Sequence, residues 1–72
     1  MVRNLENLTN AIILQAVKDY RKVLSRCNLH PEKLNYREDK ATLEQFFRSR
    51  WFSFLTDIDP EMLIRKLGEE VA

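Results

Sequence analysis

Ten consecutive positions, Phe46 to Leu55, constrain this chain most, because they hold most of its aromatic surface. The run FFRSRWFSFL contains all four phenylalanines and the only tryptophan. Soluble monomers rarely expose an apolar patch of that size, so most of these rings are expected in a core. A chain of 72 residues has room for one core, which predicts a single domain over residues 1–72. At about 0.05 to 0.15 kcal/mol per residue, its stability is expected to be about 4 to 10 kcal/mol.

The apolar residues of the first third repeat with a helical period, which predicts a long amphipathic helix. Either Asn4 or Thr9 is a suitable N-cap, so the start of this helix stays open. Its end is predicted near Asn28, which can adopt a left-handed cap conformation, because Pro31 follows. The residues on its apolar side are Leu5, Ile12, Ile13, Ala16, Val17, Tyr20, Leu24 and Cys27.

Periodicity is lost from Leu29 to Asp39, and this segment is predicted to be a loop, either irregular throughout or with one helical turn begun by Pro31. Leu34 and Tyr36 are expected to hold the loop against the body. The second helix is predicted to start near Asp39 or Lys40, where Asp39 is a suitable cap.

The course of the second helix through the aromatic run stays open. A continuous helix would turn Phe52 away from the side that holds Phe47 and Phe54. Ser49 offers a solution, since it can end one helix and cap a separate short helix over 50–56. Such a helix can bury its own apolar side chains in a different direction. These side chains are Trp51, Phe54 and Leu55.

The last helix has the plainest start in the chain. Asp59 is a good N-cap, Pro60 suits the first helical position, and Glu61 suits the positive first turn. Gly68 is the predicted end. The fold class expected is therefore all-α, a small bundle of three main helices, with the second either intact or split into two at Ser49.

Charge is unevenly distributed along the chain, although the net charge is only +1. Nine basic against five acidic residues from Lys18 to Arg50 give +4, and two against five from Asp57 onward give −3. A value this close to zero argues against a dedicated polyanion binder. The split is interpreted as ordinary solvated helix surface.

Two short patterns could carry chemistry, and neither is interpreted as doing so. Cys27 and His30 are three apart, but Asn28 and Pro31 break a helix there and no third ligand is evident. Asp57 and Asp59 alternate in TDIDPE, but a calcium site needs about six oxygens, so helix capping is the interpretation. No enzyme activity, cofactor or metal is expected.

The leading functional expectation is a protein-interaction module. Its candidate surface is a cluster of arginines and aromatic rings, a composition that binding hot spots favour. The partner would be an unidentified protein or another copy of the chain. The residues of the candidate surface are Arg48, Arg50, Trp51 and Phe52.

The alternative is a small helical DNA-binding protein of the helix-turn-helix type, using the region from Arg48 to Arg50. Further basic residues line the first helix, namely Lys18, Arg21, Lys22 and Arg26. The sign of the charge at the start of the best-defined helix argues against DNA binding, because Asp59 and Glu61 would meet phosphate there.

No membrane span is expected, since the longest apolar run, Ala11 to Leu14, is far shorter than the roughly 20 residues that a bilayer requires. The opening MVRNLENLTN lacks the apolar region of a secretory signal. A cytoplasmic location is therefore expected.

Two blocks, Asn10 to Leu24 and Leu43 to Leu67, resemble short proteins of prophages and other mobile elements in Gram-positive bacteria. In that family an FFRS run is followed by an acidic residue, then WF and an LTD segment. The matching residues here are Phe46 to Ser49, Trp51 with Phe52, and Leu55 to Asp57. Arg50 departs from the pattern, which weakens its interpretation as a phosphate contact. The resemblance implies a phage-related origin with no known activity, and it supplies no catalytic residues.

Overall fold

The computed structural model describes the backbone of residues 2–71 and the side chains of residues 8–71. Residues 2–71 form four helices and no strand: α1 (Val2–Leu29), α2 (Leu34–Phe47), α3 (Arg50–Leu55) and α4 (Pro60–Val71). The expected all-α fold is confirmed, with three long helices. The split at Ser49 is also confirmed, because it separates α2 from α3.

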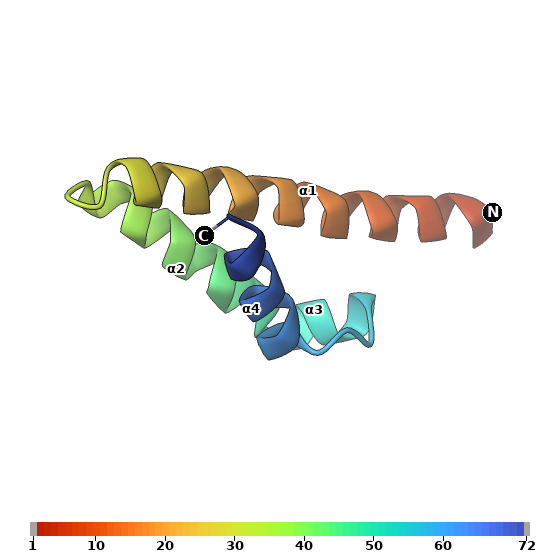
Figure 1. The fold of residues 1–72 in the computed structure, drawn as a ribbon. Coiled ribbons are helices and arrows are strands. Elements are labelled where there is room, and N and C mark those ends of the chain that lie inside the picture. The colour runs from red at the N-terminus through yellow and green to blue at the C-terminus, as the bar shows by residue number, and fades with distance from the viewer. Residues whose placement is uncertain (1, 72) are drawn as a thin grey trace.

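The long helix α1 sets the shape of the molecule. At 1.5 Å per residue its 28 residues span about 42 Å, close to the longest molecular dimension of 46 Å. Figure 1 shows α2 returning beside α1, α4 lying across both, and α3 at the far end of α2. The N-terminal end of α1 extends past the other helices in this view. None of the helices in residues 2–71 is both long and apolar enough to cross a bilayer.

The core lies where α1, α2 and α4 meet, and three aromatic residues fill it. Tyr20, Phe47 and Phe52 are each almost completely buried. The Phe47 ring meets Tyr20 edge-on at 5.5 Å and Phe52 edge-on at 5.4 Å between centroids. Such edge-to-face pairs stabilise a core beyond the area that they bury. Ala16 and Leu24 of α1 and Leu67 of α4 complete the buried cluster.

The end of α1 lies within one residue of the predicted position, but its caps differ from the expectation. The helix begins at Val2, ahead of both proposed caps. It ends at Leu29, and no non-glycine residue among those described has a positive φ, so the expected left-handed cap at Asn28 is wrong. The helical hydrogen-bond pattern instead carries on by one residue, with the His30 amide donating to the Arg26 carbonyl at 2.8 Å. The Asn28 amide group is used elsewhere, donating to the Val71 carbonyl of α4 at 3.4 Å.

The predicted loop before α2 is much shorter in the structure. Only residues 30–33 are non-helical, so the predicted start of α2 at Asp39 or Lys40 is wrong by about five residues. The first turns of α2 are mostly exposed, and a helix without a buried side has no apolar period to reveal it. Leu34 is exposed and does not hold the segment, whereas Tyr36 is half-buried with the Arg26 guanidinium 5.9 Å from its ring centre.

The start of α4 is confirmed and its end is not. The Asp59 carboxylate accepts a hydrogen bond from the Glu61 amide at 3.0 Å, with Pro60 as the first helical residue. Gly68 does not terminate α4, which runs on to Val71. Contacts from α1 support this extra turn, because the side chain of Arg21 bonds to Glu70 at 3.0 Å. A packing partner can therefore override the low helix propensity of glycine.

Candidate interaction surface

The serine between α2 and α3 redirects the chain. The Ser49 hydroxyl donates to the Phe46 carbonyl at 2.6 Å and accepts from the Phe52 amide at 3.2 Å. One side chain thus satisfies the last turn of α2 and the first turn of α3. Serine is among the preferred N-cap residues because its oxygen can bond in this way. Because of this break, the direction of α3 is not fixed by α2, and a different ring of α3 can face the core.

The ring of α3 that faces the core is Phe52. It is 1% exposed and also packs edge-on against Phe46, at 5.7 Å between centroids. The expectation that Phe52 belongs to the candidate surface is therefore wrong. Trp51, the other aromatic residue of the candidate surface, is 59% exposed, as that surface requires. The separate short helix does not bury Phe54 either, since Phe54 is 75% exposed. On a single short helix at 100° per residue, burying one of these neighbours turns the others outward.

The exposed rings form a small surface with one arginine. Phe54 is two residues from Phe52 and so lies on the opposite side of α3. Arg50 and Trp51 precede Phe54 by four and three residues, which places all three side chains on one helical face. Arg50 is exposed and makes no ion pair with the described residues. We call Arg50, Trp51 and Phe54 the α3 surface.

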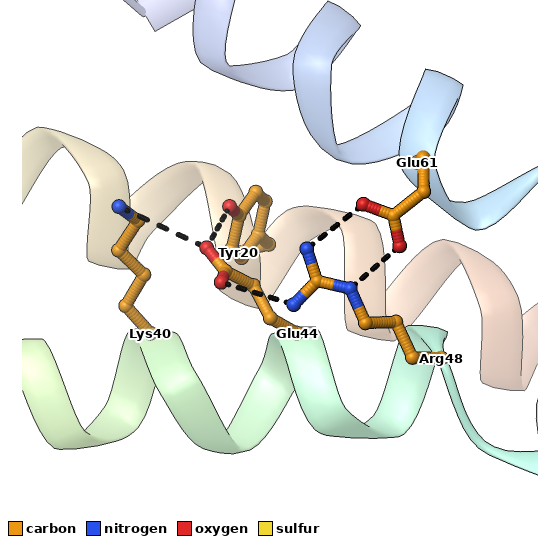
Figure 2. Close-up of polar contacts among 5 residues, drawn as sticks. All are labelled: Tyr20, Lys40, Glu44, Arg48 and Glu61. Carbon is orange, nitrogen blue, oxygen red and sulfur yellow. Dashed lines mark hydrogen bonds and ion pairs between the residues drawn. The ribbon is translucent and has the colours of Figure 1, made fainter.

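Arg48, also expected on the candidate surface, is engaged within the chain. Figure 2 shows its guanidinium between two carboxylates. Its Nε and Nη2 donate to the Glu61 carboxylate at 2.6 and 2.9 Å, and its Nη1 lies 3.6 Å from Glu44. The hydrogen bonds from Arg48 lower the pKa of Glu61 and raise the pKa of Arg48 itself. Arg48 therefore joins the end of α2 to the start of α4 instead of being presented to a partner.

A second polar contact joins α1 to α2 within the same network. The Tyr20 hydroxyl donates to the Glu44 carboxylate at 2.6 Å, and Lys40 lies 3.8 Å from that carboxylate (Figure 2). Burial, with the hydrogen bond to Glu44, raises the pKa of Tyr20 well above its usual value. No buried side-chain polar atom lacks a partner in the described part of the chain. The network links three helices, and each charge in it faces an opposite charge.

Other residues singled out in the sequence lie in α1 and in the loop that follows it. Cys27 is half-buried, and His30 lies 3.6 Å from Glu32 in the loop. Among the side chains of residues 8–71, no three Cys, His, Asp or Glu gather as metal ligands would. Of the basic residues on α1, Arg21 is paired with Glu70.

One feature was missed from the sequence, an apolar groove between α1 and α2. It has a volume of about 540 Å³. The sequence does contain a signal for this groove. Ala11 and Gln15 lie beside the buried side of α1, and both are uncharged. The residues that line it are Ala11, Ile12, Gln15, Ala16, Asp19, Thr42, Leu43 and Phe46.

Comparison of the chain with protein-family models, with curated proteins and with solved structures finds no match.

Proposed function

We propose that this chain is a non-enzymatic, phage-related accessory protein of the cytoplasm that acts by binding another protein through the α3 surface. One observation carries the proposal: Trp51 and Phe54 are exposed together on a helix whose position the core fixes. Phe52 holds α3 against α2, and the Ser49 cap sets its direction.

Exposed rings on a rigid support are well suited to protein binding. Trp51 and Phe54 each have only two side-chain torsions to fix, so immobilising them costs little entropy for the apolar area that they offer. Arg50 adds a planar donor at the edge of the rings. The complementary partner surface is an apolar pocket with a carboxylate at its rim.

The polar groups that converge elsewhere support a non-catalytic role. Lys40 and Arg48 neutralise Glu44 and Glu61. The Tyr20 hydroxyl is bonded to Glu44. Groups held in this way act as connections between helices. A general acid or base needs, in contrast, a proton that a substrate can reach.

A capture experiment tests the proposal. The tagged chain is exposed to lysate of a Gram-positive host, beside a Trp51→Ala/Phe54→Ala double variant. The control is Leu29→Ala/Leu34→Ala, which removes two equally apolar exposed side chains near the other end of α2. We expect a specific protein with the wild type and the control, and its loss with the α3 variant. Equal capture by all three would refute a role for the α3 surface.

The DNA-binding alternative loses some of its proposed contacts, because Arg21 and Arg48 already pair with Glu70 and Glu61. Arg50 stays exposed and can serve either function. Chemical-shift titration with duplex DNA at low salt separates the two. Shifts at Arg50 and along the basic side of α1 would favour DNA, and their absence would leave the protein partner.

A further inference from the structure

The segment that joins α4 to the rest of the chain has no hydrogen bond to α1 or α2 among the residues described. Residues 56–59, between α3 and α4, are not helical. The Thr56 amide donates to the Phe52 carbonyl at 3.1 Å, and the Ile58 amide donates to the Thr56 hydroxyl at 3.3 Å. The position of α4 therefore depends mainly on contacts of α4 itself.

Few side chains of α4 reach the core. Leu67 is its only buried residue and joins the buried cluster of α1, α2 and α3. Leu63, Ile64 and Val71 pack against that cluster but stay partly exposed. These residues form one apolar stripe, because each lies three or four positions from Leu67. Most of the surface of α4 therefore stays outside the core.

Two arginines fix the two ends of α4, and both ion pairs face water. Arg48 of α2 bonds to Glu61 in the first turn, and Arg21 of α1 bonds to Glu70 in the last turn. Between 47% and 63% of each of these four side chains is exposed. Ion pairs at such exposure contribute little to stability. We call the face of α1 and α2 between Arg21 and Arg48 the α4 seat.

The rings below α4 hold one another without it. Phe47 of α2 packs edge-on against Tyr20 of α1 and against Phe52 of α3. Phe46 of α2 makes a further edge-on contact with Phe52. The Tyr20 hydroxyl also bonds to Glu44 of α2. The first three helices are therefore joined by contacts that do not include α4.

We propose that α4 is a displaceable cover: it leaves the α4 seat as a unit while α1, α2 and α3 stay folded, and an amphipathic helix of a partner protein binds in its place. Proteins open locally at the elements with few buried apolar contacts. A free helix of 12 residues is marginal in water, and Gly68 lowers the helix propensity of α4 further. The displaced segment therefore loses its helical form. In the closed state α4 blocks the partner.

The partner is defined by what α4 itself brings to the seat. A competing helix needs an apolar stripe with a four-residue repeat, and a carboxylate near each end to bond the arginines of the seat. The residues of α4 that have this pattern are Leu63, Leu67 and Val71, with Glu61 and Glu70 nine positions apart. Such a partner differs from the one proposed for the α3 surface, which offers a pocket instead of a helix. Trp51 and Phe54 are not part of the cluster under α4.

Native-state hydrogen exchange tests whether α4 opens on its own. In the wild type we expect the amides of residues 64–68 to exchange at least about tenfold faster than the slowest amides of α1 and α2. Ser49→Ala weakens the cap of α3, so it should speed the slowest amides about fivefold and leave the α4 amides unchanged. If α4 opens only when the whole chain unfolds, both rates rise equally.

A matched pair of variants on α1 tests the arginine contact. Arg21→Gln removes the pair with Glu70 and should speed exchange in α4 about two- to fivefold. Lys22→Gln is the control, because Lys22 is exposed and makes no ion pair with the described residues. It should leave the α4 amides unchanged, and equal effects of the two variants would contradict the role of Arg21.

Displacement is tested with Leu67→Glu, which places a charge at a buried position and keeps α4 off its seat. Its circular dichroism should lose only the helical signal of α4. A peptide of residues 57–72 with the native sequence is then added at millimolar concentration to the isotope-labelled variant. We expect chemical-shift changes at the amides of Arg21 and Arg48, and none with a control peptide that carries Leu67→Glu.

Equal exchange rates in α4 and in the slowest parts of α1 and α2 overturn the separate opening, and so does complete unfolding of Leu67→Glu. A native peptide that shifts no more amides than the control peptide overturns the α4 seat as a site for a helix. Trp51→Ala/Phe54→Ala should leave both measurements unchanged, so a failure here is distinct from a failure of the α3 surface.

Discussion

Phe52 and Trp51 are consecutive in the chain and lie on opposite sides of the core boundary. Phe52 is enclosed by the rings of Phe46 and Phe47, whereas more than half of the Trp51 side chain faces water. Phe54 is exposed still further. The aromatic run therefore does two things: it closes the core and leaves two rings available on the surface.

Phe52→Ala and Phe54→Ala should differ greatly in their effect on stability. Removing the buried Phe52 ring leaves a cavity and is expected to cost about 3 to 5 kcal/mol, a large part of the stability of so small a domain. Removing the exposed Phe54 ring should change stability by less than about 0.5 kcal/mol. Urea unfolding followed by circular dichroism measures both. Similar losses for the two variants would show that the rings are not divided in this way.

Ser49→Ala tests the cap between α2 and α3. Loss of the bond to the Phe52 amide is expected to cost about 1 kcal/mol. Ser53→Ala is the control, because the Ser53 hydroxyl only donates to the Arg50 carbonyl in the preceding turn and is exposed. That change should alter the free energy of unfolding by less than about 0.5 kcal/mol. A Ser49→Ala variant as stable as Ser53→Ala would mean that the break does not depend on the cap.

Gly68→Ala should stabilise the protein. Gly68 lies inside α4 with a negative φ, and an added Cβ would meet no atom within 4 Å. Alanine restricts the unfolded chain more than glycine does, which is expected to contribute about 0.4 to 1 kcal/mol. Thermal unfolding of the two proteins gives the difference. A lower melting temperature for the variant would indicate that α4 ends at Gly68, as the sequence alone predicted.

Tyr20 should make the protein sensitive to alkali. Its pKa is raised in the folded state, mainly by burial and also by the bond to Glu44, so folding favours the neutral phenol. The stabilisation that the folded state gains from the neutral phenol is fully present below the ordinary tyrosine pKa of about 10. It is lost as the pH rises above that value. The free energy of unfolding of the wild type should therefore fall more steeply above about pH 10 than that of Tyr20→Phe. At neutral pH the variant should be less stable by about 1 kcal/mol, the usual contribution of one hydrogen bond. Parallel slopes for the two proteins would contradict the role given to Tyr20.

Local rules predicted those parts of the fold that depend on a few adjacent residues. The start of α4 follows from Asp59 and Pro60, and the break at Ser49 follows from the capping ability of serine. Both depend on bonds within three positions of the residue concerned. The long amphipathic helix was predicted from a different signal, because the packing of one side of α1, Tyr20 included, against other helices imposes a regular apolar period on the sequence.

Features that depend on distant contacts were not predicted correctly. The last turn of α4 lies beside α1, where Arg21 and Asn28 bond to it. No residue near Gly68 in the sequence indicates these two contacts. The early start of α2 was missed because its first residues are exposed and have no apolar period. The sequence analysis placed Phe52 on the surface, where the structure has Phe54, and this error also arises from a distant contact. Two rings two residues apart are equivalent in the sequence, and only the direction of α3 distinguishes them.

The central claim is that α3 presents Trp51 to solvent while Phe52 closes the core, and the fluorescence of Trp51 tests it most directly. Trp51 is the only tryptophan, so emission and quenching by acrylamide report on this side chain alone. The measurement is made on folded protein at low concentration and repeated on the chain unfolded in urea. We expect the folded protein to show emission and quenching close to those of the unfolded chain. A strongly blue-shifted emission that acrylamide cannot quench would place Trp51 in the core and contradict the α3 surface.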